Sequence, residues 1–211
     1  MKLKLHAGFA AAAAAFAMAS TASFAVDGVI LIDQNKALAG NVTAGDTAGY
    51  PVTINTPGSY RLSGNLTVPA GKHGIVFAAD GITLDLNGFS ISGPSGEYGL
   101  TDDSVGRSRI AIRNGHVNGF SDSVRMIAST HLVVENMTLS PEGAAIAVVV
   151  GAFSRVQRNT VVGNGLIQAT CPSILTENIS NGFVTSFVTD AAKQCIRYHN
   201  RSLNYGGTIS E

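Results

Sequence analysis

The chain of 211 residues carries 14 basic and 14 acidic side chains, so it lacks the positive charge excess typical of nucleic-acid-binding proteins. Charged residues make up only 13% of it and 24 positions are glycine, and this composition favours strands and tight turns over helices. The length suits one domain.

The first 25 residues have the three parts of a secretory signal peptide. Lys2 and Lys4 give a basic start, residues 7–19 form an apolar run, and Ala22-Ser-Phe-Ala25 matches a small-x-small cleavage site. The apolar run is short for a membrane span, and an uncleaved anchor helix is the alternative. We therefore expect residues 1–25 to be a signal peptide and the protein to be secreted or periplasmic, with no membrane span.

Residues 26–50 are expected to lead into the main domain, which spans residues 51–211. Residues 29–32 are apolar and fit a leading strand, whereas residues 33–49 are small and polar and are expected to form a loop. Short apolar segments separated by Pro and Gly follow, and none of them has the 3.6-residue period of a helix. The strands expected here are Pro51–Ile54, Tyr60–Leu62, Leu66–Val68 and Ile75–Phe77.

A phrase of alternating apolar residues that ends in asparagine returns about every 22 residues from position 109 onward. Its first copy, RIAIRNGHV, is followed by LVVEN, VQRN, ILTEN and IRYHN, with spacings of 22, 23, 19 and 22 between asparagines. Repeats of this length predict stacked turns of a coil, because one turn cannot bury its own apolar side chains. Asparagine tolerates left-handed backbone angles at a bend, so its role is expected to be structural. The asparagines are Asn114, Asn136, Asn159, Asn178 and Asn200.

Alternate residues within each copy are expected to point into the coil. Val156 breaks this alternation, because it stands three residues before its asparagine. Residues 143–150 are continuously apolar, which is typical of a strand covered on both sides. Residues 93–108 form the longest insertion and are expected to be a loop that stands off the coil. The inward pairs are Ile110 with Ile112, Leu132 with Val134, Ile174 with Thr176, and Ile196 with Tyr198.

The outward residues just before each bend are expected to form a row of alternating charge. One interpretation is a ladder of ion pairs on an exposed sheet, in which each pair stabilises the fold by about 0–1 kcal/mol. The other interpretation is a substrate groove, with residues 93–108 as its wall. The row is Asp85, Arg113, Glu135, Arg158, Glu177 and His199, with Gln157 as the alternative to Arg158 in the irregular copy.

The stacked repeat, the asparagine bend, the export signal and the stretch TINTPGSYRLSGNLTV (Thr53–Val68) resemble small secreted bacterial proteins of the pectate-lyase-like superfamily. The resemblance covers residues 51–203. It implies an all-β, single-stranded right-handed parallel β-helix (a solenoid) of about seven to eight short rungs, with a glycan along the outward sheet. The chain lacks that family's Asp-His run and its Arg-x-Pro-x-x-Arg cluster, and the fold hosts many activities.

Lyase or epimerase chemistry on an acidic sugar needs a cation beside the carboxylate and a base that moves the C5 proton. The candidate catalytic residues are Arg113 as the cation and His131 or Glu135 as the base. Asp102–Asp103 either binds Ca²⁺ through hard oxygens, holds a general acid, or is a solvated turn. No other metal or cofactor is expected. The candidate substrate-binding residues are Asp102, Asp103, Arg109, Arg158, Glu177 and His199.

We therefore expect an exported β-helix protein that binds or modifies an acidic polysaccharide along its outward sheet, with lyase- or epimerase-like chemistry as the modification. The alternative is a non-catalytic envelope, surface or adhesion module whose β-helix serves as a rigid spacer. Cys171 and Cys195 are 24 residues apart. They either form a disulfide between adjacent turns or remain two thiols in neighbouring loops.

Overall fold

The computed structural model describes residues 28–94, 96–143, 146–181, 187–189, 195–203 and 209–210. The predicted signal peptide lies outside these ranges. The chain folds into an all-β parallel β-helix of about six turns, slightly fewer than the seven to eight rungs expected. Within the part of the chain described here, no helix is long and apolar enough to cross a membrane.

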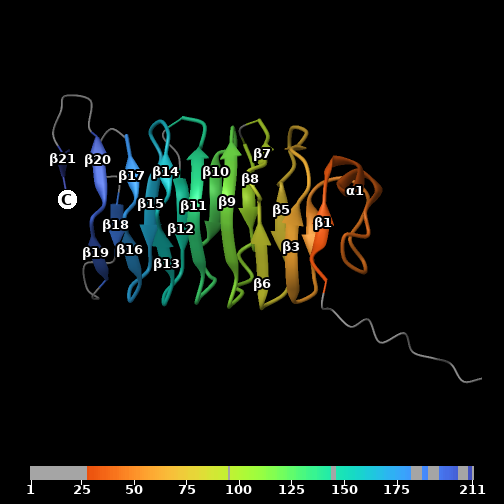
Figure 1. The fold of residues 1–211 in the computed structure, drawn as a ribbon, viewed down its shortest axis with the longest axis horizontal. Coiled ribbons are helices and arrows are strands. Elements are labelled where there is room, and N and C mark those ends of the chain that lie inside the picture. Colours follow the sequence, from red (N-terminus) through yellow and green to blue (C-terminus); the bar gives the residue numbers. More distant parts are fainter. Residues whose placement is uncertain are drawn as a thin grey trace, which may run out of the picture.

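The segment that precedes the first full turn covers one end of the coil. β1 (Ile30–Ile32) pairs in parallel with β3 (Gly58–Leu62), and α1 (Gln34–Ala39) follows it at the end of the stack (Figure 1). Asp33 is the N-cap of α1 and accepts a 2.8 Å hydrogen bond from the backbone N–H of Lys36. The prediction of a loop over residues 33–49 is therefore wrong for residues 34–39, which form α1. The sequence did not reveal this helix, because six residues are too few to show a helical period.

The described strands, β1 and β3 included, form a 14-stranded and a 7-stranded sheet. The only antiparallel pair among them joins β20 (Arg201–Leu203) to β21 (Ile209–Ser210). Each turn crosses the 14-stranded sheet twice, once before and once after a bend. The first arm, before the bend, contains β3, β6 (Ile82–Asp85), the first halves of β9 (Ala111–Asn118) and β11 (Val133–Ser140), β13 (Arg155–Gln157), β16 (Ile174–Thr176) and β19 (Ile196–Tyr198). The second arm, after the bend, contains β4 (Leu66–Thr67), β7 (Ser90–Ser92), the second halves of β9 and β11, β14 (Thr160–Val161), β17 (Ile179–Ser180) and β20.

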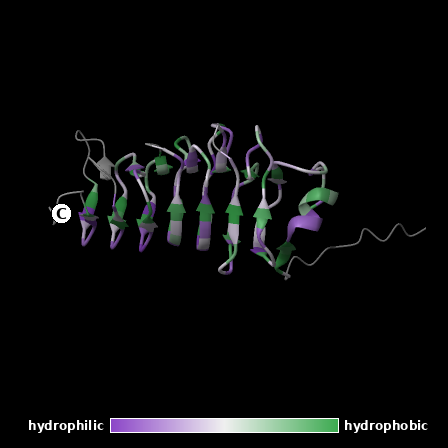
Figure 2. Ribbon diagram, turned by 90° about the horizontal axis from the view of Figure 1, so that it is seen from above, coloured by the Kyte–Doolittle hydropathy of each residue, from purple (hydrophilic) through white to green (hydrophobic). Residues whose placement is uncertain are grey.

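The 7-stranded sheet forms the third side of each turn, beside the first and second arms. Seen from above, the turns lie in one row, with α1 at the end opposite the C-terminus (Figure 2). The strands of this sheet are β2 (Val52–Ile54), β5 (Ile75–Phe77), β8 (Tyr98–Thr101), β10 (Asp122–Met126), β12 (Ile146–Val150), β15 (Leu166–Ala169) and β18 (Phe187–Thr189).

A continuous apolar core runs along the coil, because equivalent inward residues of successive turns lie next to each other. The strand register places Leu84, Ile112, Val134, Val156 and Leu175 in one column, and all five are fully buried. Burial of such side chains is the main favourable term in folding and contributes about 1.5–3 kcal/mol for each. This column explains why the turns stack rather than fold separately.

In the later turns, the predicted inward residues are out of phase by one. Leu175, rather than Ile174 or Thr176, joins the inward column, and Ile174 lies on the outer face of the sheet. Ile196 and Tyr198 are about half exposed rather than buried. The predictions for Ile110, Ile112, Leu132 and Val134 are confirmed, since all four are buried.

The phase error arises because the recurring asparagines occupy two different positions. Asn114 and Asn136 lie at the bend itself, with left-handed φ angles of 62° and 54°. In the later turns the left-handed residue stands one position before the asparagine. These residues are Arg158, Glu177 and His199, with φ angles of 53°, 57° and 56°.

The later asparagines form a buried ladder along the coil axis. The side-chain N–H₂ of Asn178 donates to the carbonyl of Val156 and to Oδ1 of Asn200, both at 2.9 Å. Its own Oδ1 accepts from the backbone and side-chain N–H groups of Asn159, both at 3.0 Å. The amides therefore satisfy backbone groups at the point where the chain turns, which agrees with a structural role for these residues.

Most of the insertion at residues 93–108 belongs to the coil. It supplies β8, which pairs with β5 and β10, and Leu100, Thr101 and Asp102 are buried. The expectation of a stand-off loop is therefore wrong. Cys171 and Cys195 form a disulfide that joins two adjacent turns.

Candidate functional site

The outer face of the first arm carries the predicted charged row in corrected form. The register places Asp85 beside Arg113, Arg113 beside Glu135 and Glu135 beside Gln157. Thr176 and Tyr198 continue this row, so the predicted membership of Arg158, Glu177 and His199 is wrong. Those three residues lie at the bend instead, for the reason given above.

The charges in this row are largely neutralised by neighbouring side chains. Asp85 lies 3.9 Å from Arg61 and 3.6 Å from Nε of Arg113. Glu135 accepts hydrogen bonds from Gln157 at 2.6 Å and from Arg158 at 3.0 Å. Exposed pairs of this kind contribute about 0–1 kcal/mol each. The arrangement supports the ion-pair ladder, and the catalytic roles suggested for Arg113 and Glu135 stay predictions.

Asp102 and Asp103 face different partners. Asp102 is buried, and its two oxygens accept hydrogen bonds from the hydroxyl of Ser129 and the backbone N–H of Ser104. Asp103 is exposed and lies 3.7 Å from Nε2 of His73. Their carboxylates are therefore not arranged as a joint Ca²⁺ site, and no group of three or more His, Cys, Asp or Glu side chains suited to a metal occurs among the residues described.

Arg109 anchors the start of its turn to the turn before. Its guanidinium donates to Oδ2 of Asp80 at 3.4 Å, and Ser108 donates to the same carboxylate through its backbone N–H and its hydroxyl, both at 3.0 Å. The hydrogen bonds from Ser108, first the backbone and then the hydroxyl, hold the pKa of Asp80 below its usual value, and Arg109 adds to the effect. Arg109 is exposed and therefore accessible from the outer face.

Glu177 and His199 lie near each other, but at the bend and not on the predicted row. Both line a hollow of about 450 Å³ together with Ile179, Asn200 and Arg201. This hollow shares no lining residue with the larger hollow described below.

A column of exposed residues borders the first arm where its strands begin. Arg109, His131 and Phe153 occupy equivalent positions in successive turns, with φ angles of 57°, 56° and 59°. Each donates its backbone N–H to the next turn, to Thr130, Ala152 and Pro172 respectively. We call Arg109, His131 and Phe153 the wall column. His131 therefore lies before β11 begins, whereas the other candidate base, Glu135, lies on that strand.

Phe153 is an unusual residue for this position. A non-glycine residue in the left-handed conformation costs about 1 kcal/mol or more, and Phe153 is 59% exposed, so burial does not offset that cost. Its ring stacks on His131, with centroids 5.2 Å apart and an angle of 15° between the planes. Arg109 and His131 share this backbone conformation, so the left-handed bend belongs to the coil, and the exposed, stacked ring is what distinguishes Phe153.

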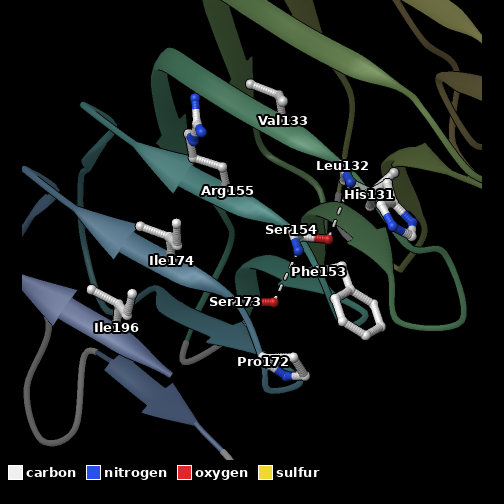
Figure 3. Close-up of a pocket in the computed structure, with 10 residues that line it drawn as sticks. All are labelled: His131, Leu132, Val133, Phe153, Ser154, Arg155, Pro172, Ser173, Ile174 and Ile196. Carbon is white, nitrogen blue, oxygen red and sulfur yellow. Dashed lines mark hydrogen bonds between the residues drawn. The ribbon is translucent and has the colours of Figure 1, made fainter. Parts of the chain in front are cut away.

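Two members of the wall column, His131 and Phe153, form one side of a hollow of about 510 Å³ on the outer face of the first arm (Figure 3). Its floor consists of Val133, Arg155, Ile174 and Ile196, which lie side by side on β11, β13, β16 and β19. Pro172 continues the border beyond Phe153 (Figure 3). The hollow therefore spans four successive turns of the coil.

Arg155 is the charged residue in the floor. It is exposed and forms no ion pair or side-chain hydrogen bond with any other residue in the described ranges. By contrast, two nearby arginines, Arg113 in the charged row and Arg158 at the bend, both lie against carboxylates. Arg155 is thus a cation on an apolar surface, free to bind an anionic group.

The sequence predicted His131 as a site residue but missed Phe153, Arg155, Pro172 and the outward isoleucines Ile174 and Ile196. A signal was present, because Phe153 and Arg155 each follow their counterparts His131 and Val133 by 22 residues. Alignment on the asparagines hid it, since that alignment is one residue out from the irregular copy onward.

No protein-family model, curated protein or solved structure matches this chain. The hollow and the free arginine in its floor are therefore interpreted from their own chemistry. An aromatic side, an apolar floor and one cation suit a ligand with a flat, weakly polar face and a negative charge.

Proposed function

We propose that this β-helix binds an acidic polysaccharide on the outer face of its first arm, with the hollow as the main binding site. The observation that carries the proposal is the free guanidinium of Arg155 on an apolar floor that the exposed ring of Phe153 borders. The apolar face of a sugar ring packs on an aromatic ring, and a uronate carboxylate accepts paired hydrogen bonds from arginine.

The linear shape of the site supports a polymer as the ligand. The hollow crosses four strands spaced about 4.8 Å apart, so its floor extends over roughly the length of two to three sugar units. The row of strands continues beyond β11 toward the N-terminal end of the coil. The resemblance of the repeat to secreted β-helix proteins of the pectate-lyase-like superfamily supports the same ligand class.

The geometry favours binding over turnover. The proposed cation and one proposed base, Arg113 and Glu135, are held by Asp85 and by Arg158 with Gln157. The other base, His131, lies in the wall column, stacked on Phe153. Lyase- or epimerase-like modification is tested on the same samples, by absorbance of unsaturated ends and by NMR of the sugar C5 configuration.

Export of the protein forms part of the proposal. The disulfide between Cys171 and Cys195 supports it, because structural disulfides persist in oxidising compartments. A secreted or periplasmic location would place the outer face in contact with extracellular polysaccharide.

The test is titration of alginate and pectin oligosaccharides, with neutral dextran as the comparison polymer, by isothermal calorimetry. Arg155→Gln should weaken binding of the acidic oligosaccharides by roughly tenfold or more, as expected for a lost charge-assisted pair. Arg201→Gln removes an exposed arginine from the second arm and is the matched control. Equal affinity for dextran and the uronates, or equal effects of the two variants, would refute the assignment.

A further inference from the structure

The floor of the hollow offers few hydrogen-bonding groups to a ligand. Three of its four side chains, Val133, Ile174 and Ile196, are aliphatic, and Ile196 is 56% exposed. Phe153 and Pro172 add two further apolar surfaces at the border. Arg155 and the outer nitrogen of His131 are the polar groups that face outward.

The serines in the lining are already occupied by the protein. Ser154 accepts a hydrogen bond from the backbone of Leu132 and donates to Ala152, and Ser173 accepts from the backbone of Ser154 and donates to Thr170. Both serines are buried. Neither hydroxyl is therefore available to a sugar.

A sugar unit with all its hydroxyl groups free fits such a floor poorly. Each hydroxyl pressed against the isoleucines would lose its water without gaining a partner, a penalty that disfavours the complex. An O-acyl ester has no donor to satisfy, and its methyl group gains from contact with aliphatic side chains. A cation and an aliphatic floor together thus distinguish sugar units by whether their hydroxyl groups are acylated, as well as by their charge.

We propose that the hollow selects O-acetylated units of the acidic polysaccharide, an inference that rests on the proposed function. The uronate carboxylate binds Arg155, a neighbouring sugar ring of the polymer packs on Phe153, and the acetyl methyl group lies between Ile174 and Ile196. The two isoleucines follow Arg155 on the next two strands, so the acetyl group lies to one side of the carboxylate, toward the C-terminal end of the coil.

The experiment compares one polymer in two forms. O-acetylated alginate oligosaccharides and the same preparation after mild alkaline deacetylation are titrated into the full chain. The acetylated form should bind roughly tenfold more tightly, the discrimination typical of one methyl-sized group in an apolar site. Equal affinity, or tighter binding of the deacetylated form, overturns the inference and leaves the proposed function standing. Binding of neither form overturns both.

Ile174→Thr keeps a β-branched residue in β16 and places a hydroxyl in the floor. It should reduce the preference for the acetylated form to about twofold or less, with little change in affinity for the deacetylated form. Ile179→Thr makes the same exchange at an exposed position on the second arm and should leave the preference intact. An unchanged preference in Ile174→Thr, or an equal loss in Ile179→Thr, overturns the assignment of the floor.

Discussion

The asparagine ladder gives the sharpest test of how the coil is held together. Asn136 and Asn178 stand at the same place in the repeated phrase, in LVVEN and ILTEN. Asn136 nevertheless lies exposed at the bend of its turn, whereas Asn178 is fully buried and follows the bend residue of its own turn by one position. Truncation of each to alanine therefore compares two residues that the sequence treats as equivalent.

Asn178→Ala removes four hydrogen bonds, two donated and two accepted. It leaves the buried backbone N–H of Asn159 without its acceptor and the carbonyl of Val156 without this donor. With about 1–3 kcal/mol for each buried group that loses its partner, the expected loss of unfolding free energy is about 3–4 kcal/mol. Asn136→Ala removes two exposed hydrogen bonds, to Asn114 and from Arg158, and places alanine at a left-handed φ of 54°, so it should cost about 1–2 kcal/mol.

The assay is urea unfolding followed by far-ultraviolet circular dichroism, combined with hydrogen exchange at the amide of Asn159. Asn178→Ala should unfold at a lower urea concentration than Asn136→Ala, and the Asn159 amide should exchange faster in Asn178→Ala alone. Coincident unfolding curves for the two variants, with equal protection of that amide, would refute the argument that the buried ladder carries this stability.

Three further predictions concern two titratable side chains and the disulfide. Ser108 and Arg109 lower the pKa of Asp80 in the folded state. The contribution of this carboxylate to the free energy of unfolding is therefore complete above the unfolded pKa of about 3.9 and is lost as the pH falls through the lower folded pKa. Asp80→Asn should be less stable than the wild type at pH 7, and a stability difference that does not shrink in acid contradicts this. Burial raises the pKa of Tyr50 to about 12. Between about pH 10 and pH 12 only the unfolded phenol ionises, so the wild type should lose stability relative to Tyr50→Phe. Parallel stability curves for the two proteins over that range would be inconsistent with this expectation. The double change Cys171→Ser with Cys195→Ser removes the disulfide that joins two residues 24 positions apart. It should lower the free energy of unfolding, measured in urea, by about 3 kcal/mol. An unchanged urea midpoint would show that the last turn is held in place without the disulfide.

The repeat length and the inward alternation were sufficient to predict a stacked parallel coil. Ile112 and Val134 show why, because an apolar residue every second position and a 22-residue offset admit few other packings. The short helix α1 was not predictable in this way, since six residues carry no period and its cap, Asp33, is as common in turns.

The site was predictable only in part, because side-chain phase depends on where the bend falls. A shift of one residue moves every side chain of a strand to the other face. Asn159 looks like Asn136 in the sequence, but its turn bends at Arg158, so the prediction placed Ile174 inside and hid Arg155 from the outer face. Asparagine fits both positions chemically, and its occurrence alone does not separate them.

The constant offset between β9, β11 and β13 makes the turn a unit that can be removed or copied. His131 and Phe153 are 22 residues apart and share one backbone conformation, so joining Thr130 directly to Phe153 would delete a complete turn and bring Ala111 into register with Arg155. Such a protein would be shorter by one strand spacing of about 4.8 Å, with the rest of its core unchanged. Duplication of the same segment would instead add a second histidine to the wall column. The length of this surface is thus a discrete variable, set by how many copies of a 22-residue segment the gene contains.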